Sequence, residues 1–210
     1  MTETATGVVL RTWPLTETSL IIHWLTPDLG RLATAAKGAR RPKSPFRGKL
    51  DLFFLAEFSF SRSPRSSLHN LREVGLRETH SALREDLGRL EQASYAAALI
   101  EQVTEAETPL PAIFELMRGL LGALVSGPTQ PQTLFAFELK LLQDLGLQPD
   151  LEQTRLSPGV KQIVRALSQS AWNSVGRVKP SAVQTAELTH FLHGFLEYHF
   201  GKVPRGRPSL

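Results

Sequence analysis

The residues whose side chains point most clearly to a binding function are six cations in one short stretch. Residues 37–49 read KGARRPKSPFRGK, with no acidic residue, two prolines and two glycines. This composition favours a loop over a helix. Clustered cations bind phosphates, because each neutralised phosphate releases condensed counterions. We expect an anion-binding loop, the alternative being a solvated loop that only aids solubility. The candidate phosphate contacts are Lys37, Arg40, Arg41, Lys43, Arg47 and Lys49, with Arg31 on the preceding strand.

Aromatic side chains near this loop could add base stacking, which contributes about 1–3 kcal/mol per base. Most aromatic residues on strands are core residues, so we expect Trp13, Trp24, Phe58 and Phe60 to be buried. Phe46 lies inside the basic stretch and is the one aromatic residue that we predict to contact DNA.

Motifs of enzymes and metal sites are absent from the sequence. Gly48-Lys49 is followed by Leu50, so the phosphate-binding motif G-x-x-x-x-G-K-[ST] is missing, as are H-E-x-x-H and G-x-S-x-G. His190, His193 and Glu197 have helical spacing, and we interpret them as a helix edge rather than a metal site. The chain has no cysteine, which excludes disulfides and thiolate ligands. We predict a protein that is not an enzyme and holds no cofactor or metal.

The positive charge is concentrated in the first part of the chain. Of 210 residues, the first 80 contain 12 Lys/Arg and 7 Asp/Glu (12 − 7 = +5), and the rest contain 12 and 13 (12 − 13 = −1). This asymmetry indicates an anionic partner, either nucleic acid or a membrane surface. No uninterrupted apolar stretch reaches the length of a membrane span, and the polar N-terminus does not resemble a secretory signal. We expect a cytoplasmic protein.

Strands come first along the chain and helices second. Residues 6–13, 19–25, 31–36, 52–60 and 68–74 have β-branched or alternating patterns, which suits a small barrel. From residue 83 the apolar period becomes helical, with breaks at 108–111, 126–128 and 146. Ser157-Pro158 and Pro180-Ser181 open two further helices. We predict an α+β protein with a barrel domain over 1–78, a helical domain over 79–202 and a flexible basic tail over 203–210.

Several segments resemble the bacterial RecO family. In the N-terminal part these are residues 6–12 (TGVVLRT), 30–32 (GRL) and 36–41 (AKGARR). In the helical part they are residues 83–87 (LREDL) and 136–146 (AFELKLLQDLG), followed by Pro149-Asp150-Leu151. The resemblance spans nearly the whole chain.

The resemblance implies an N-terminal OB-fold β-barrel followed by an all-helical domain. It implies a recombination mediator in DNA repair, without catalytic residues, that binds single- and double-stranded DNA and anneals complementary strands. It also implies help in loading recombinase onto DNA coated with single-strand-binding protein, with that protein and RecR as partners, in the cytoplasm at the nucleoid. The alternative is a protein–protein adaptor of a repair complex whose DNA affinity is incidental.

One departure from the family concerns the segment after Asp150-Leu151. Many members carry a four-cysteine zinc-binding insertion there, whereas residues 152–156 (EQTRL) run directly into Ser157-Pro158. A partner surface built on that module is therefore in doubt. We expect instead that a groove between helices accepts the acidic, apolar tail of single-strand-binding protein, near Arg118, Lys140 or Arg165.

Overall fold

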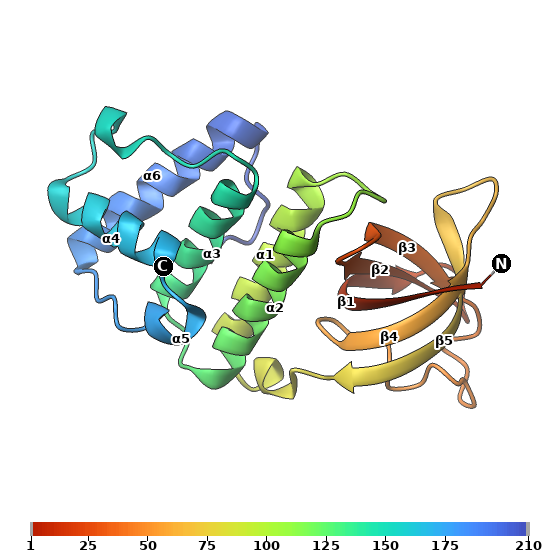
Figure 1. Cartoon of the computed structure of the whole chain (residues 1–210). Helices are drawn as coiled ribbons and strands as arrows, with labels where there is room; N and C mark the ends of the chain where they lie inside the picture. Colours follow the sequence, from red (N-terminus) through yellow and green to blue (C-terminus); the bar gives the residue numbers. More distant parts are fainter. Residues whose placement is uncertain (1, 209–210) are drawn as a thin grey trace. The chain divides into compact units, whose positions relative to one another are not determined.

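The computed structural model of the chain describes residues 2–208 and divides into two compact units (Figure 1). The first unit holds the chain up to His80 together with Thr104–Glu115. The second holds Ser81–Val103 and the chain from Leu116. The strand-rich and helix-rich parts follow the predicted order, but the grouping of Thr104–Glu115 with the barrel was not predicted.

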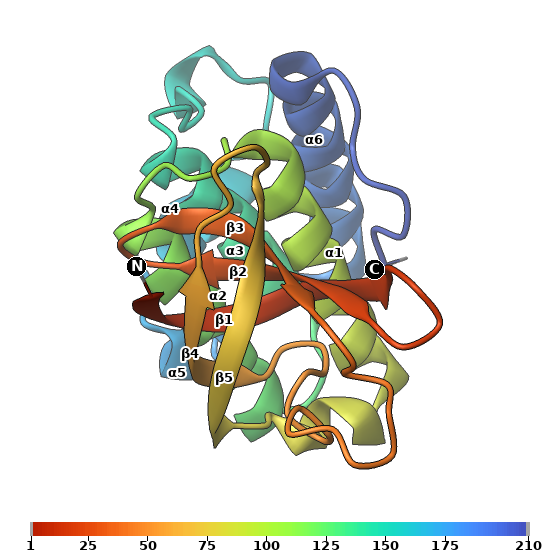
Figure 2. The same cartoon turned by 90° about the vertical axis from the view of Figure 1, so that its right-hand side faces the viewer.

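The first unit is a closed five-stranded barrel. Its strands are β1 (Thr2–Pro14), β2 (Leu20–Thr26), β3 (Gly30–Ala36), β4 (Leu55–Ser61) and β5 (Leu68–Glu78). They pair in the order β1-β2-β3-β5-β4, antiparallel except for β3 with β5, and β4 returns to β1. Figure 2 views this barrel from the side, with the orange β3–β4 loop below it. The predicted OB-type barrel is confirmed.

Aromatic side chains fill the barrel. Trp24 is fully buried, stacks on Phe58 with 4.1 Å between ring centroids, and donates its indole N–H to the Thr34 hydroxyl at 2.9 Å. Phe60 lies in the same core. The polar end of the tryptophan is therefore satisfied without reaching solvent. This confirms the expected burial of Trp24, Phe58 and Phe60.

The fourth strand begins later than the sequence pattern predicts. Residues 52–54 were expected to belong to it, but Phe53 has φ +64°, which ends regular pairing. The Phe53 amide donates to the Val9 carbonyl at 2.8 Å, and the Val9 amide donates to the Phe54 carbonyl at 3.0 Å. Both phenyl rings are buried, so burial of the side chains, rather than strand geometry, explains this apolar run.

A segment distant in sequence completes the pairing of β3. The short parallel ladder between β3 and β5 covers only Ala33–Ala35, which leaves the start of β3 without a neighbour on that side. Arg31 pairs there with Ala106, and the Glu107 amide donates to the Arg31 carbonyl at 2.8 Å. Residues 104–108 therefore satisfy backbone groups that an open edge would expose.

Helices make up the second unit. They are α1 (Leu87–Val103), the part of α2 (Pro111–Ser126) from Leu116, α3 (Pro131–Asp144), α4 (Pro158–Gln169), α5 (Trp172–Val175) and α6 (Ala182–Phe200), with short 3-10 turns at Ser81–Glu85 and Leu151–Gln153. The central helix α3 is buried on nearly all sides and contacts α1, α4, α5 and α6. Ser157 caps α4 as predicted, and Ser181 with Gln184 forms a capping box on α6.

A buried charge on α3 holds the C-terminal segment. Glu138 is fully buried, and Arg207 binds both of its carboxylate oxygens, at 2.9 and 2.8 Å. The Tyr95 hydroxyl donates to the same carboxylate at 2.8 Å. Burial by itself lowers the pKa of Arg207, but the hydrogen bonds and charge of Glu138 outweigh it and raise that pKa. In the segment predicted to be a flexible tail over 203–210, Arg207 thus binds Glu138 and Val203 is buried; residues 209–210 lie outside the described residues.

A glycine substitution tests the attachment of residues 104–108. Gly30 has φ +64°, and a Cβ there would lie 1.8 Å from the Thr108 carbonyl oxygen, whereas Gly48 has φ +71° and open space around it. Gly48→Ala should cost only the conformational strain of about 1–2 kcal/mol. Gly30→Ala should cost a further 1–3 kcal/mol or so through overpacking. Urea unfolding of both variants measures the difference, and equal losses would contradict the close approach.

A second substitution tests the buried ion pair. Arg207→Ala leaves the Glu138 carboxylate buried without its cation and should lower the free energy of unfolding by about 3–5 kcal/mol. The control Arg205→Ala removes an exposed arginine from the same segment and should change stability by less than about 0.5 kcal/mol. Adding Glu138→Gln to the Arg207→Ala variant should restore part of the loss. Thermal unfolding checks all three, and a neutral Arg207→Ala would show that the pair does not stabilise the unit.

Candidate nucleic-acid interface

The basic stretch folds as a chain of tight turns between β3 and β4. Amide-to-carbonyl hydrogen bonds three residues apart join Arg41 to Gly38, Ser44 to Arg41 and Arg47 to Ser44, at 3.0–3.2 Å. Gly38 supplies a left-handed backbone position at φ +70°. The predicted loop is therefore present, and its backbone is ordered by its own hydrogen bonds.

Phe46 anchors this loop instead of presenting a ring to a ligand. Its side chain is only 7% exposed and belongs to the barrel core, where Ala39 and Leu50 from the same loop also pack. A ring at this depth cannot stack on a base, so the expectation that Phe46 contacts DNA is corrected. The charge of the loop suggested that the Phe46 ring would be exposed along with its neighbours. The ring is buried instead, because an apolar side chain gains from leaving water whereas the cations around it do not.

The cations around Phe46 face solvent. The side chains of Lys37, Arg40, Arg41, Lys43 and Arg47 are exposed, and Lys49 is half-buried. Within residues 2–208 none of these six forms an ion pair with a carboxylate. The Arg40 amide donates to the Thr18 carbonyl at 3.0 Å and the Gly38 amide to the Ser19 hydroxyl at 3.3 Å, which fixes the loop beside the β1–β2 turn. These hydrogen bonds hold the backbone of a loop whose cationic side chains face solvent.

Arg31 has a different role from the one expected. Its Nε donates to the Thr104 hydroxyl at 2.7 Å, and its Nη2 donates to the Thr104 carbonyl. The side chain is half-buried by this contact. We therefore separate Arg31 from the six loop cations and assign it to holding residues 104–108 on β3.

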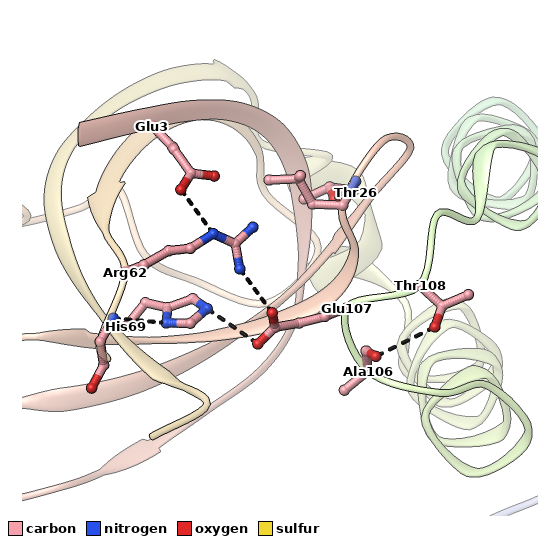
Figure 3. A network of polar contacts seen from close by, with 9 residues as sticks. Glu3, Thr26, Arg62, His69, Ala106, Glu107 and Thr108 are labelled. Atoms are coloured by element: carbon pink, nitrogen blue, oxygen red, sulfur yellow. Dashed lines mark hydrogen bonds and ion pairs between the residues drawn. The ribbon is translucent and has the colours of Figure 1, made fainter. Parts of the chain in front are cut away.

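The Glu107 carboxylate contacts an arginine and a buried histidine near the other end of β3 (Figure 3). The Glu107 carboxylate contacts Arg62 at 2.8 Å and the Nε2 of buried His69 at 3.2 Å, and Arg62 also binds Glu3 at 2.8 Å. The Ser63 amide donates to His69 Nδ1 at 3.3 Å, which places the ring proton on Nε2. The hydrogen bond to Glu3 raises the pKa of Arg62. Burial opposes this rise, and the hydrogen bond to Glu107 adds to it. The network joins two carboxylates to one guanidinium, so it offers no free cation to an anion, unlike the basic loop.

A hollow of about 170 Å³ opens on the outer face of β2 and β3. It is lined by His23, Arg31, Leu32, Ala33 and Ser67, with Ala106 and Glu107 from the docked segment. This face, flanked by the β1–β2 and β4–β5 loops, is the one on which OB barrels bind oligonucleotides.

Of the three residues expected at a helical groove, Arg165 and Lys140 lie at one cavity and Arg118 does not. Arg165 lines a cavity of about 200 Å³ between α3 and α4, together with Leu139, Leu151 and Val164. The Lys140 ammonium donates to the Ser168 carbonyl at the same cavity at 2.9 Å, and burial lowers its pKa despite the neighbouring Asp144. Arg118 is exposed on α2 and does not line this cavity.

Short polar contacts hold the segment after Asp150-Leu151, where the resemblance led us to note the missing cysteine-rich insertion. Asp150 caps the turn at Leu151–Gln153, and Glu187 accepts from the Ser157 amide at 2.6 Å and its hydroxyl at 2.8 Å. His193 and Glu197 lie exposed on α6, 3.6 Å apart. Over residues 2–208 no three His, Asp or Glu side chains come together as a metal site. Among the same residues, no helix has the length and apolarity to cross a bilayer.

Comparison with known proteins gives two family matches. The model described as "Recombination protein O N terminal" matches residues 1–80, and "Recombination protein O C terminal" matches residues 84–155. The proteins named DNA repair protein RecO from Anaeromyxobacter sp. (strain K) and Rhodopirellula baltica are 37% and 35% identical over 147 and 143 residues. These matches cover 70% and 68% of this chain but 58% and 53% of the relatives, so the chain matches little more than half their length.

Proposed function

Because this chain belongs to the RecO family, we propose that it is a recombination mediator that binds single- and double-stranded DNA and anneals complementary strands. The observation that carries the proposal is the cluster of solvent-facing cations on the loop that Phe46 fixes to the barrel. A fixed loop loses little conformational entropy on binding, so its charges act together on one stretch of phosphates.

Annealing by this mechanism needs no covalent chemistry. Two complementary strands repel each other through their phosphates, and bound cations reduce that repulsion. The six loop residues would hold the backbone of a strand while its bases remain available for pairing. Sequence-independent contacts of this kind suit a protein that must act on any complementary pair.

We further propose that the chain assists recombinase loading on DNA coated with single-strand-binding protein, in the cytoplasm at the nucleoid, with RecR as a second partner. The cavity beside Arg165 and Lys140 supports a contact with an acidic, apolar peptide, because it places two cationic groups near Leu139, Leu151 and Val164 in a lining that also contains glutamines. Arg165 is paired with Glu152 at 2.8 Å, so an incoming carboxylate would exchange with that partner.

An adaptor that binds proteins and has only incidental DNA affinity is the second candidate function. The helical unit favours the adaptor function, since the residues that line its cavities are distant in sequence from the basic loop. The two functions differ in what the loop cations contribute, and the first experiment below separates them.

The DNA proposal predicts a salt-dependent affinity that resides in the loop. Wild type should bind labelled single-stranded DNA with a steep salt slope, and Arg40→Glu/Arg41→Glu should flatten the slope by about 1.4 or more, since about 0.7 counterions are released per single-strand phosphate. Fluorescence anisotropy at several salt concentrations measures this. Arg177→Glu/Arg205→Glu makes the same change in net charge at exposed sites of the helical unit and should leave the slope unchanged. A wild type that does not bind at low salt would favour the adaptor.

The groove proposal predicts a separate loss. Arg165→Glu should weaken binding of an acidic peptide with apolar C-terminal residues by about tenfold, because a charge-assisted contact of about 1.5 kcal/mol becomes repulsive. Isothermal titration calorimetry measures this affinity, and Arg177→Glu serves as the control on an exposed site away from the cavity. Unchanged peptide affinity in Arg165→Glu would place the peptide site elsewhere.

A further inference from the structure

One tryptophan of the barrel lies outside its core. Ile22 and Trp24 of β2 point into the core cluster, so the alternate residues Ile21 and His23 lie on the outer face. Across the β1–β2 ladder, Arg11 pairs with His23 and Trp13 pairs with Ile21. The rings of Trp13 and His23 meet edge to face, with 4.3 Å between centroids, which places both on the outer face. Unlike Trp24, which is fully buried, both are half-exposed.

The outer face continues from these rings in two directions. Toward the β4–β5 loop, His23 lines the open hollow that also includes Ala33 and Ser67. In the other direction, the row that carries Trp13 and Ile21 reaches β3 at Ala35, two residues before Lys37. The hydrogen bond from Arg40 to Thr18 also holds the loop against the turn that links β1 to β2. A strand whose phosphates contact the basic loop would therefore have its bases near Trp13.

The chemistry of the face distinguishes its two ends. The end at Lys37 and Arg40 carries exposed cations, with Arg11 exposed beside His23, whereas the far end of the hollow carries the Glu107 carboxylate. Glu107 is paired with Arg62, and Arg31 lines the same hollow, so phosphates are attracted mainly to the first end. Between them, Ala33 is half-exposed in the hollow that His23 lines, whereas Ala35 is buried. A face with two half-exposed aromatic rings and one cationic border fits unpaired bases attached to a phosphate backbone.

We propose that Trp13, supported by His23, is the base-stacking platform of this protein for single-stranded DNA. The proposal rests on the proposed function and adds to it the group that distinguishes single strands from duplexes. Bases in a duplex are already stacked and paired, so they cannot lie on the Trp13 ring, whereas the loop cations bind the phosphates of both forms. The loop therefore supplies general DNA affinity, and Trp13 supplies the preference for unpaired strands.

The experiment compares three DNA probes of equal length: an oligothymidylate, a duplex, and an abasic strand that has the phosphates without bases. Trp13→Leu keeps an apolar side chain and removes the aromatic ring. It should weaken binding of the oligothymidylate by about 5- to 100-fold and leave the duplex and the abasic strand unchanged, with the salt slope preserved. Trp13→Phe keeps a ring and should recover most of the affinity. Thermal unfolding of each variant confirms that the barrel is folded.

Tryptophan fluorescence provides a second readout that does not depend on affinity. Oligothymidylate should quench the emission of a Trp172→Phe variant, in which Trp13 and the buried Trp24 remain. The abasic strand should not quench it, and Trp13→Phe should abolish the quenching by oligothymidylate.

The outcomes separate this proposal from the function on which it rests. Equal weakening of all three probes by Trp13→Leu would show that Trp13 only supports the loop, and would overturn the platform. Unchanged oligothymidylate binding by Trp13→Leu, with the Arg40→Glu/Arg41→Glu loss intact, would overturn the platform and leave the DNA-binding function in place. Wild type that binds none of the probes would overturn both.

Discussion

The short parallel ladder between β3 and β5 is the constraint on which the barrel unit depends. It closes the barrel through only Ala33–Ala35, so the backbone of β3 before this point needs another partner. Residues 104–108 provide it through the Arg31–Ala106 pairing, and Gly30 allows the approach because it has no Cβ. Pairing these backbone groups offsets part of the conformational entropy that is lost when this segment is ordered. The barrel is thus completed by residues that follow the first helix of the other unit.

The same closure determines where charge can gather. A loop connects the end of β3 to the start of β4, and Phe46 holds this loop by packing in the core. Its lysines and arginines then project outward, since neither the core nor a carboxylate partner within the described residues accepts them. Elsewhere on the barrel, the network of Glu3, Arg62, His69 and Glu107 pairs its ionic side chains with one another. The two groups of ionic residues therefore serve opposite purposes: one stabilises the unit, and the other remains available to a ligand.

In the helical unit, a buried carboxylate binds a segment that is distant in sequence. Glu138 lies on a helix surrounded by others, where an unpaired charge would be very costly. Arg207 and Tyr95 bind it, and the last described residues of the chain are ordered as a result. Between α3 and α4, Asp150 caps the turn at Leu151–Gln153, and Glu187 accepts hydrogen bonds from the Ser157 amide and hydroxyl. These contacts hold the connecting segment.

The sequence by itself determined the barrel followed by helices, the basic loop and the family, because these depend on local periodicity, turn residues and charge density. It could not determine which member of a mixed segment is buried: Phe46 among cations became core, whereas Trp13 at a strand end stayed partly exposed. It also could not show that Arg31 binds Thr104, or that Arg207 reaches Glu138. Those contacts join residues 69 to 73 positions apart, and only barrel closure and helix packing bring them together. The local sequence pattern indicates which kinds of contact a residue can make, and the tertiary structure decides which partner it contacts.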